Sequence, residues 1–298
     1  PDPAITQPTT RYITGRKLPK NLFAADAAVL APQPPHWPLV LLLTFMPMAV
    51  GCSVAAALAR SPIVSDHVTN LAWLAGAAGL AASVAHLGQP LRAWRVFLGW
   101  RKSWLSREAL VLAGWFALLT LAAVWPLIFG RASALLQGAA AVAGLAGLSC
   151  SAMVYIETRR AFWQPAHTVP RFFGSALLLG LTGVLTSPGA PPTLGFALVL
   201  ATLGKLLFET RALAPLNGDR DTLTPELKTA RLLTGSLLRP VNEQRILVAG
   251  LGGILLPLTI ALGVTPGAVA WLALPCLLLG ELAERYLFFR AVVAPKMP

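Results

Sequence analysis

The chain has 298 residues, of which 56% are hydrophobic and only 12% are charged. Soluble domains carry about 25% charged residues, so this composition excludes a soluble enzyme, a disordered tail and a secreted disulfide scaffold. A net charge of +12 also occurs in nucleic-acid-binding proteins. Basic loops, however, retain the ends of membrane helices in the cytoplasm, and we expect no nucleic-acid partner. The composition indicates a polytopic membrane protein.

Residues 1–36 contain seven prolines and no apolar stretch. A segment of this kind cannot bury a core of its own, and it lacks the apolar region of a signal peptide. We therefore predict that residues 1–36 form an extended cytoplasmic arm that contacts a partner subunit.

Apolar segments follow one another along the rest of the chain. A bilayer core of about 30 Å requires roughly 17–25 apolar residues per helix, and eight segments meet this requirement. They are 37–59, 68–87, 109–129, 132–156, 172–187, 193–209, 246–265 and 267–289. We predict an all-α integral membrane protein with eight transmembrane helices in residues 37–290 and a cytoplasmic tail at 291–298. The polar loop 210–245 has room for one short helix.

Lysine and arginine are distributed very unequally between the two sides of this topology. With eight crossings, 21 of them lie on the side of both termini and two, Arg60 and Arg131, lie on the other side. Because basic loops stay in the cytoplasm, we expect both termini to be cytoplasmic, in the inner membrane of a bacterium.

The stretch His86–Arg95 is the strongest candidate for chemistry. His86 ends an apolar helix, and an imidazole titrates near neutral pH, which suits proton exchange with a quinone that enters from the lipid. Gly88 leaves room for a ring, while Arg92 and Arg95 can stabilise a negatively charged quinone oxygen. The alternative is a histidine at the membrane interface that hydrogen-bonds a loop carbonyl.

Three tryptophans with interleaved arginines follow His86. Trp94, Trp100 and Trp104 fit an aromatic belt at the membrane interface. They fit the anchors of a protein interface equally well, because tryptophan and arginine are enriched there. The sequence supports both interpretations.

Acidic and basic residues lie together at the cytoplasmic ends of several segments. Glu157 ends the fourth segment, Glu209 the sixth, and Glu281, Glu284 and Arg285 lie in the last turns of the eighth. Such groups mostly neutralise each other, and we expect Lys205 to pair across the bundle or to reach the interface. A proton relay to His86 is assigned to Glu157 and to Glu108, which lies at the start of the third segment.

Several redox motifs are missing from the sequence. The three cysteines lie far apart, which excludes an iron–sulfur cluster bound by this chain. The four histidines lie at segment ends or in loops, whereas a transmembrane haem needs two that face each other inside the bundle. We expect no haem and no metal site.

Two stretches resemble a known family. His-Leu-Gly-x-Pro-x-Arg-Ala-Trp at 86–94, followed by Ser-Trp-Leu-Ser-Arg-Glu at 103–108, resembles the anchor subunit of dimethyl sulfoxide reductase, within the polysulfide-reductase membrane-subunit superfamily. The run Tyr-Ile-Glu-Thr-Arg-Arg-Ala-Phe-Trp at 155–163 is similar to a second landmark of that family, and 36–39 resembles the opening of its first helix.

This resemblance implies a haem-free membrane subunit that exchanges electrons with ubiquinone or menaquinone. Its partners would be a four-cluster iron–sulfur subunit and a molybdopterin catalytic subunit, which carry the clusters and the molybdenum. The resemblance implies that the quinone reacts near His86, and we assign Gly88, Arg92, Trp94 and Arg95 to the same site. We expect the partner interface to include other basic and aromatic residues, namely Arg11, Arg101, Trp104, Arg107 and Arg159.

The orientation selects a reaction within the family. A catalytic unit on the cytoplasmic side resembles that of sulfite dehydrogenase (quinone), which oxidises sulfite to sulfate. The alternatives are an anchor for a dimethyl sulfoxide or polysulfide reductase, a secondary transporter, and an assembly scaffold. A transporter would show inverted repeats and polar groups at the midplane, and the sequence shows no persuasive repeat.

Overall fold

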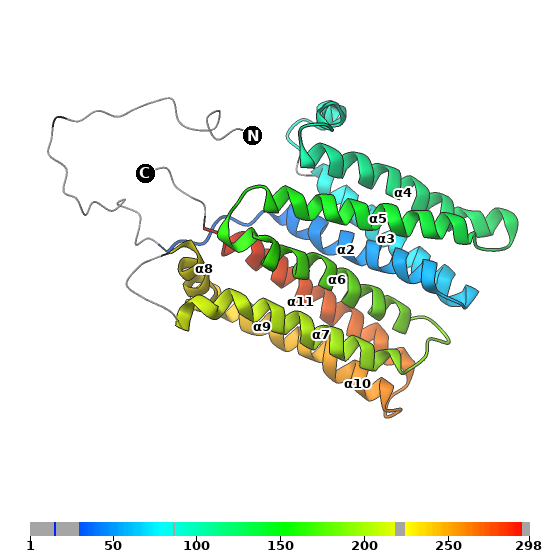
Figure 1. Ribbon diagram of the computed structural model, residues 1–298. Helices are drawn as coiled ribbons and strands as arrows, with labels where there is room; N and C mark the ends of the chain where they lie inside the picture. The colour runs from blue at the N-terminus through cyan, green and yellow to red at the C-terminus, as the bar shows by residue number, and fades with distance from the viewer. Residues whose placement is uncertain (1–14, 16–29, 86, 218–223, 294–298) are drawn as a thin grey trace. The chain divides into compact units, whose positions relative to one another are not determined.

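Helices make up the ordered framework of the chain. The computed structural model describes residue 15 and residues 30–85, 87–217 and 224–293, and no strand occurs in these ranges. The described helices all belong to one unit, Leu30–Pro295, in which the long helices lie side by side (Figure 1). This confirms the predicted all-α membrane fold.

The first half of the bundle consists of two hairpins of long helices. The helices are α2 (Trp37–Leu58), α3 (Pro62–Ala85), α4 (Trp104–Phe129) and α5 (Ala134–Ile156). At about 1.5 Å per residue each one exceeds 30 Å. Helix α2 is the most enclosed of the four, because α3, α5, α6 and α11 all pack against it.

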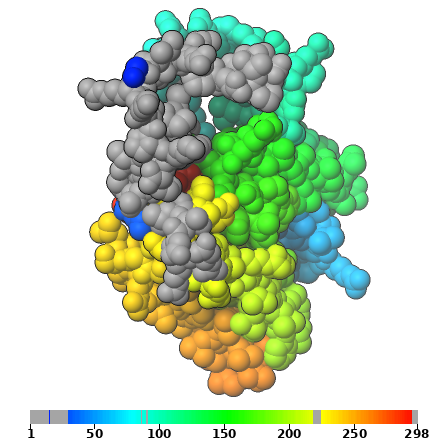
Figure 2. All heavy atoms as spheres, turned by 60° about the vertical axis from the view of Figure 1, so that its left-hand side comes forward, coloured from blue at the N-terminus to red at the C-terminus, as the bar shows by residue number. Residues whose placement is uncertain are grey.

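The second half contains four further rods and a short helical segment in the loop after α7. The rods are α6 (Pro165–Leu185), α7 (Leu194–Thr210), the composite α9 (Arg239–Gly250), η4 (Leu251–Leu255) and α10 (Leu256–Ala261), and α11 (Ala270–Arg290). The loop after α7 holds η3 (Arg211–Asn217) and α8 (Pro225–Thr234), so the short helix expected in 210–245 is present. In Figure 2, α7 to α10 form one continuous part of the surface, coloured yellow-green to orange.

In the described ranges, eight rods correspond to the eight predicted segments, and seven are long and apolar enough to span a membrane. Helix α7 has 17 residues and is therefore shorter than the others. It nevertheless runs antiparallel to the α9–α10 rod over its whole length. Gly195 at its start approaches Pro257, Thr202 lies against Gly253, and Glu209 at its end binds Arg245.

Several helices begin earlier than the apolar segments predict. Helix α6 begins at Pro165 instead of residue 172, and α3, α4 and α9 likewise begin before their apolar runs. Hydropathy marks where lipid contact begins, whereas helical hydrogen bonding continues into the polar turn before it. Proline at the first helical position, as at Pro165, favours such a start. Arg171, expected in the loop after the fourth segment, therefore lies inside α6 and is buried.

The crossing of α2 and α6 brings two backbones into direct contact. A Cβ atom on Gly51 would overlap the carbonyl oxygen of Ala176, and one on Gly180 would lie 2.7 Å from the carbonyl carbon of Gly51. Small residues permit this approach, and close packing replaces the hydrophobic driving force that is missing between helices in lipid. The two glycines therefore set the distance between α2 and α6.

Substituting alanine at this crossing should separate the two helices. We expect Gly51→Ala to lower the free energy of unfolding by about 1–3 kcal/mol, as overpacking does. Gly114→Ala on α4 is the matched control, because nothing lies within 4 Å of its Cβ position and alanine favours the helix by up to about 1 kcal/mol. The measurement is the thermal unfolding midpoint of the purified protein in detergent; equal midpoints for the two variants would contradict this account.

Candidate functional site

The segment between α3 and α4 carries the predicted quinone-site residues. Residues Pro90–Gly99 form a 3₁₀ helix, η1, and Gly88, Arg92, Trp94 and Arg95 are exposed on it or just before it. The guanidinium of Arg95 lies 5.9 Å from the centre of the Trp94 ring. His86 lies outside the described residues, as does Arg11.

Arginine also stacks on the next two tryptophans of this segment. Arg101 lies 5.1 Å from the ring centre of Trp100, and Arg107 lies 4.4 Å from that of Trp104. Arg107 in addition donates hydrogen bonds of 2.9 Å to the carbonyl oxygens of Trp100 and Arg101. Arg107 thus attaches the loop to the first turn of α4. The side chain of Arg101 is exposed at the surface.

Glu108 is buried on the inner face of the same turn of α4. Its carboxylate accepts a hydrogen bond from the hydroxyl of Ser151 on α5. The two helices run antiparallel in a register that places Glu108 beside Ser151. One and two turns further along α4, the same register places Leu112 opposite Gly147 and Trp115 opposite Gly144. A buried carboxyl group therefore lies near the start of α4, beside the segment that carries the predicted quinone site.

The other predicted relay residue lies in a different setting. Glu157 follows the last turn of α5 and is exposed, and Arg159, two residues on, is exposed with a positive φ of 55°. Within the described residues, no hydrogen bond or ion pair joins Glu157 to Glu108. The structure thus places Glu157 at the surface and Glu108 in the interior.

A second polar region lies between α6, α7, α9 and α11. Lys205 on α7 binds two carboxylates, Glu209 one turn further on and Glu281 on α11, each with an N–O distance of 2.7 Å. Glu209 also binds Arg245 on α9 at 2.6 Å. Of the two alternatives expected for Lys205, the structure shows pairing across the bundle.

The same chain of contacts continues on the α6 side. Ser175 donates a hydrogen bond to Glu281 and accepts one of 2.9 Å from Arg285. Arg285 binds Glu284 at 2.9 Å, and Glu284 binds Arg171 on α6 at 2.7 Å. These eight residues form one continuous cluster, which we call the ion-pair network: Arg171, Ser175, Lys205, Glu209, Arg245, Glu281, Glu284 and Arg285.

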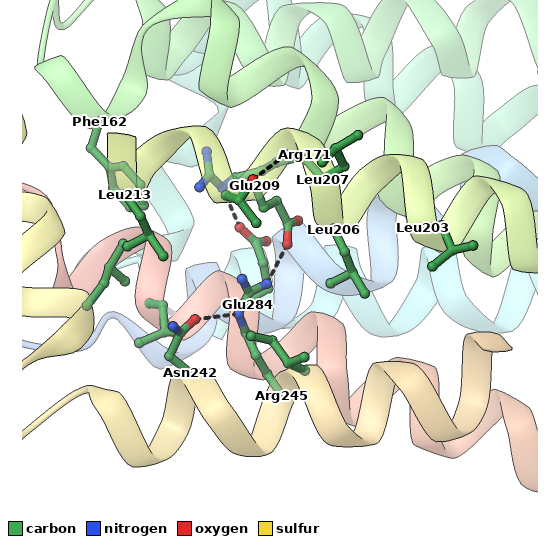
Figure 3. Close-up of a pocket in the computed structure, with 14 residues that line it drawn as sticks. Phe162, Arg171, Leu203, Leu206, Leu207, Glu209, Leu213, Asn242, Arg245 and Glu284 are labelled. Carbon is green, nitrogen blue, oxygen red and sulfur yellow. Dashed lines mark hydrogen bonds and ion pairs between the residues drawn. The ribbon is translucent and has the colours of Figure 1, made fainter. Parts of the chain in front are cut away.

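A cavity of about 310 Å³ borders one end of the ion-pair network (Figure 3). Its polar wall contains Arg171, Glu209, Asn242, Arg245 and Glu284, and its remaining wall is mostly leucine and isoleucine from α7, α9 and α11. In Figure 3, Arg245 on α9 reaches Glu209 on α7, and Asn242 on α9 lies beside Arg245. The cavity therefore combines charge with an apolar lining.

The sequence singled out five charged members of this network, Lys205, Glu209, Glu281, Glu284 and Arg285. It did not single out Arg171 or Arg245, and it identified neither the individual partners nor the cavity. Glu281 and Lys205 are 76 residues apart, and Arg285 binds the carbonyl oxygen of Leu43, 242 residues away. The sequence nonetheless contains a feature that indicates such a cluster. Lysine and glutamate inside apolar segments are costly unless they are paired, and their number predicts a shared cluster.

Removing one carboxylate from the network should be costly. Glu281→Leu leaves the Lys205 ammonium with Glu209 alone, and uncompensated buried charges of this kind cost about 3–5 kcal/mol. Glu243→Leu is the control, because Glu243 pairs with Arg239 while both side chains are more than half exposed, and such a pair contributes about 0–1 kcal/mol. Thermal unfolding in detergent measures both variants, and similar losses for the two would refute the role of the network.

Comparison with known proteins agrees with this architecture. Residues 35–224 match the family model described as DMSO reductase anchor subunit (DmsC). Over 116 residues the chain is 40% identical to a sulfite dehydrogenase subunit of Allochromatium vinosum, and this match spans 35% of the chain and 35% of the relative. The family model includes both α4–α5 and α6–α7. The chain belongs to the DMSO reductase anchor subunit (DmsC) family.

Proposed function

We propose that this chain anchors an oxidoreductase complex in the membrane and passes electrons between an iron–sulfur partner and the quinone pool. Membership of the anchor-subunit family supports this role over a secondary transporter or a scaffold. The observation that carries the quinone assignment is the buried Glu108, held by Ser151 next to the segment of His86.

Quinone chemistry moves two protons together with two electrons, so the site needs groups that hold and release protons. Glu108 is buried, and among the described residues its hydrogen-bond partner is the neutral hydroxyl of Ser151. It can exchange a proton without breaking an ion pair. His86 would exchange protons with the quinone oxygen, Arg92 or Arg95 would stabilise negative charge on that oxygen, and Glu157, exposed at the end of α5, would connect the site to the aqueous phase.

The exposed aromatic and basic residues of η1 and its flanks suit a docking surface. Trp94 and Trp100 are 57% and 49% exposed, and arginines stack on both rings. Such pairs are common anchors of protein interfaces and equally fit the membrane interface. We assign this surface, including Arg101, Trp104 and Arg107, to the iron–sulfur partner, together with Arg11, Arg159 and the arm.

For the reaction we propose the oxidation of sulfite to sulfate by a molybdopterin partner in the cytoplasm. Lysine and arginine are concentrated at the helix ends on the side of the η1 segment. This excess supports a cytoplasmic location of that side and of the catalytic partner. The relative from Allochromatium vinosum, which bears a sulfite dehydrogenase name, favours the same substrate. A dimethyl sulfoxide or polysulfide reductase that oxidises quinol is the second candidate, supported by the family description.

Substitutions at His86 and Glu108 test the quinone site. In the assembled complex, His86→Ala and Glu108→Gln should each slow quinone-linked turnover by about 10²-fold or more, because a positioned proton-transfer group contributes about that factor. Turnover with a soluble electron acceptor should stay unchanged, since that route bypasses the membrane subunit. Glu243→Gln, at an exposed position on α9, is the control. Full quinone activity in an assembled His86→Ala complex would place the site elsewhere.

Reporter fusions test the orientation. We expect a cytoplasmic signal from a reporter after residue 298 and an external signal from one inserted at residues 188–192, in the turn between α6 and α7. The reason is the bias of basic residues toward the other ends of these helices. An external C-terminus would remove the support for sulfite and favour a reductase with an external catalytic unit.

A further inference from the structure

The ion-pair network beside the cavity carries an excess of positive charge, although the charged residues that line the cavity itself balance. The network contains four cations, Arg171, Lys205, Arg245 and Arg285, but only three carboxylates, Glu209, Glu281 and Glu284. Most of their side chains are at most 4% exposed. In a medium of low dielectric constant one unpaired charge is expensive, so the network favours an additional negative group.

The unused hydrogen-bond donors of the network point to where that group binds. Arg245 is the most exposed of the charged network residues, with 13% of its side chain accessible, and it borders the cavity. Its Nε atom donates to Asn242 Oδ1 at 2.9 Å and its Nη1 atom to Glu209 at 2.6 Å. In the described part of the chain, neither the Nη2 group of Arg245 nor the side-chain amide of Asn242 donates to any acceptor. Two donors thus meet at one edge of the cavity, beside a network whose charge is positive in sum, and charge-assisted donors of this kind bind oxyanions.

Part of the apolar wall of the cavity is exposed at the surface of the bundle. Leu203, Leu207 and Ile246 line it and are 48%, 71% and 43% exposed. Since α7 and the α9 rod lie beside the other long helices of the bundle (Figure 1), we expect these exposed side chains to contact acyl chains. A ligand that enters between α7 and α9 therefore reaches the donors from the bilayer.

We propose that this cavity binds an anionic phospholipid of the phosphatidylglycerol type. Its phosphate accepts hydrogen bonds from Arg245 and Asn242 and compensates the extra positive charge, while an acyl chain lies along Leu203, Leu207 and Ile246. A zwitterionic phospholipid returns a positive charge to the site, and a quinone carries no charge to compensate. The bound lipid links α7 to α9 at the headgroup level.

The test uses the full-length protein, purified in detergent and stripped of lipid. Added phosphatidylglycerol should raise the thermal unfolding midpoint by about a few degrees, because a ligand that binds only the folded state stabilises it. Phosphatidylethanolamine should act at least about 10-fold more weakly, as expected for the loss of a charge-assisted contact. Equal effects of the two lipids, or no effect of either, would overturn the proposal. The same holds for full stabilisation by inorganic phosphate, which would indicate a soluble anion, or for displacement of the lipid by a quinone analogue.

Two variants locate the binding site. Asn242→Asp retains the oxygen that accepts from Arg245 and adds a negative charge, so it should weaken phosphatidylglycerol binding by about 10-fold or more while the protein still folds. Arg245→Gln should have a similar effect. Arg239→Gln, on the same helix but paired with Glu243 at the exposed surface, is the control. Unchanged lipid binding by Asn242→Asp, measured by native mass spectrometry, would exclude this cavity.

Discussion

Pairing of buried charge is the constraint on which the second half of this bundle depends. Helices in lipid gain no hydrophobic free energy from burying leucine against leucine, because the lipid is equally apolar. The ion-pair network instead joins α6, α7, α9 and α11, and Arg285 extends it to α2 by donating a hydrogen bond of 2.9 Å to the carbonyl oxygen of Leu43. Each charged side chain of the network compensates the charge of its neighbours, and these ion pairs fix the positions of the helices relative to one another.

Small residues provide the second means of fixing that arrangement. Gly51 and Gly180 let α2 and α6 touch through their backbones. Gly252 and Gly253 lie in the π-helical turn η4, where a Cβ would collide with Ala273 and Cys276 of α11 or with Thr202 of α7. A π turn interrupts the regular hydrogen bonding of a helix. Here the π turn and its glycines allow the α9–α10 rod to pack closely against both α7 and α11.

The helices were predictable from the sequence because bilayer thickness imposes a length on apolar segments. Some helix ends were less predictable, since hydropathy does not register that Pro165–Arg171 continues the helix of α6 as a polar turn. That Lys205 either pairs across the bundle or reaches the interface followed from the cost of an unpaired ammonium in lipid. The identity of its partner Glu281 did not, because a contact over 76 residues depends on how the rods pack. For the same reason Ser151 gave no sequence signal as the partner of Glu108.

The buried carboxylates in the described ranges fall into two chemical kinds, and this division separates the two halves of the bundle. Glu209, Glu281 and Glu284 each contact one or two cations, so protonating any of them would leave a buried positive charge without compensation. Glu108 binds the hydroxyl of Ser151, which stabilises a carboxylate much less than a cation does. Gaining or losing a proton there disturbs no ion pair. The α6–α11 half is therefore suited to holding fixed charge, whereas the α3–α5 half is suited to proton exchange, which is why we assign the quinone to the segment beside α4.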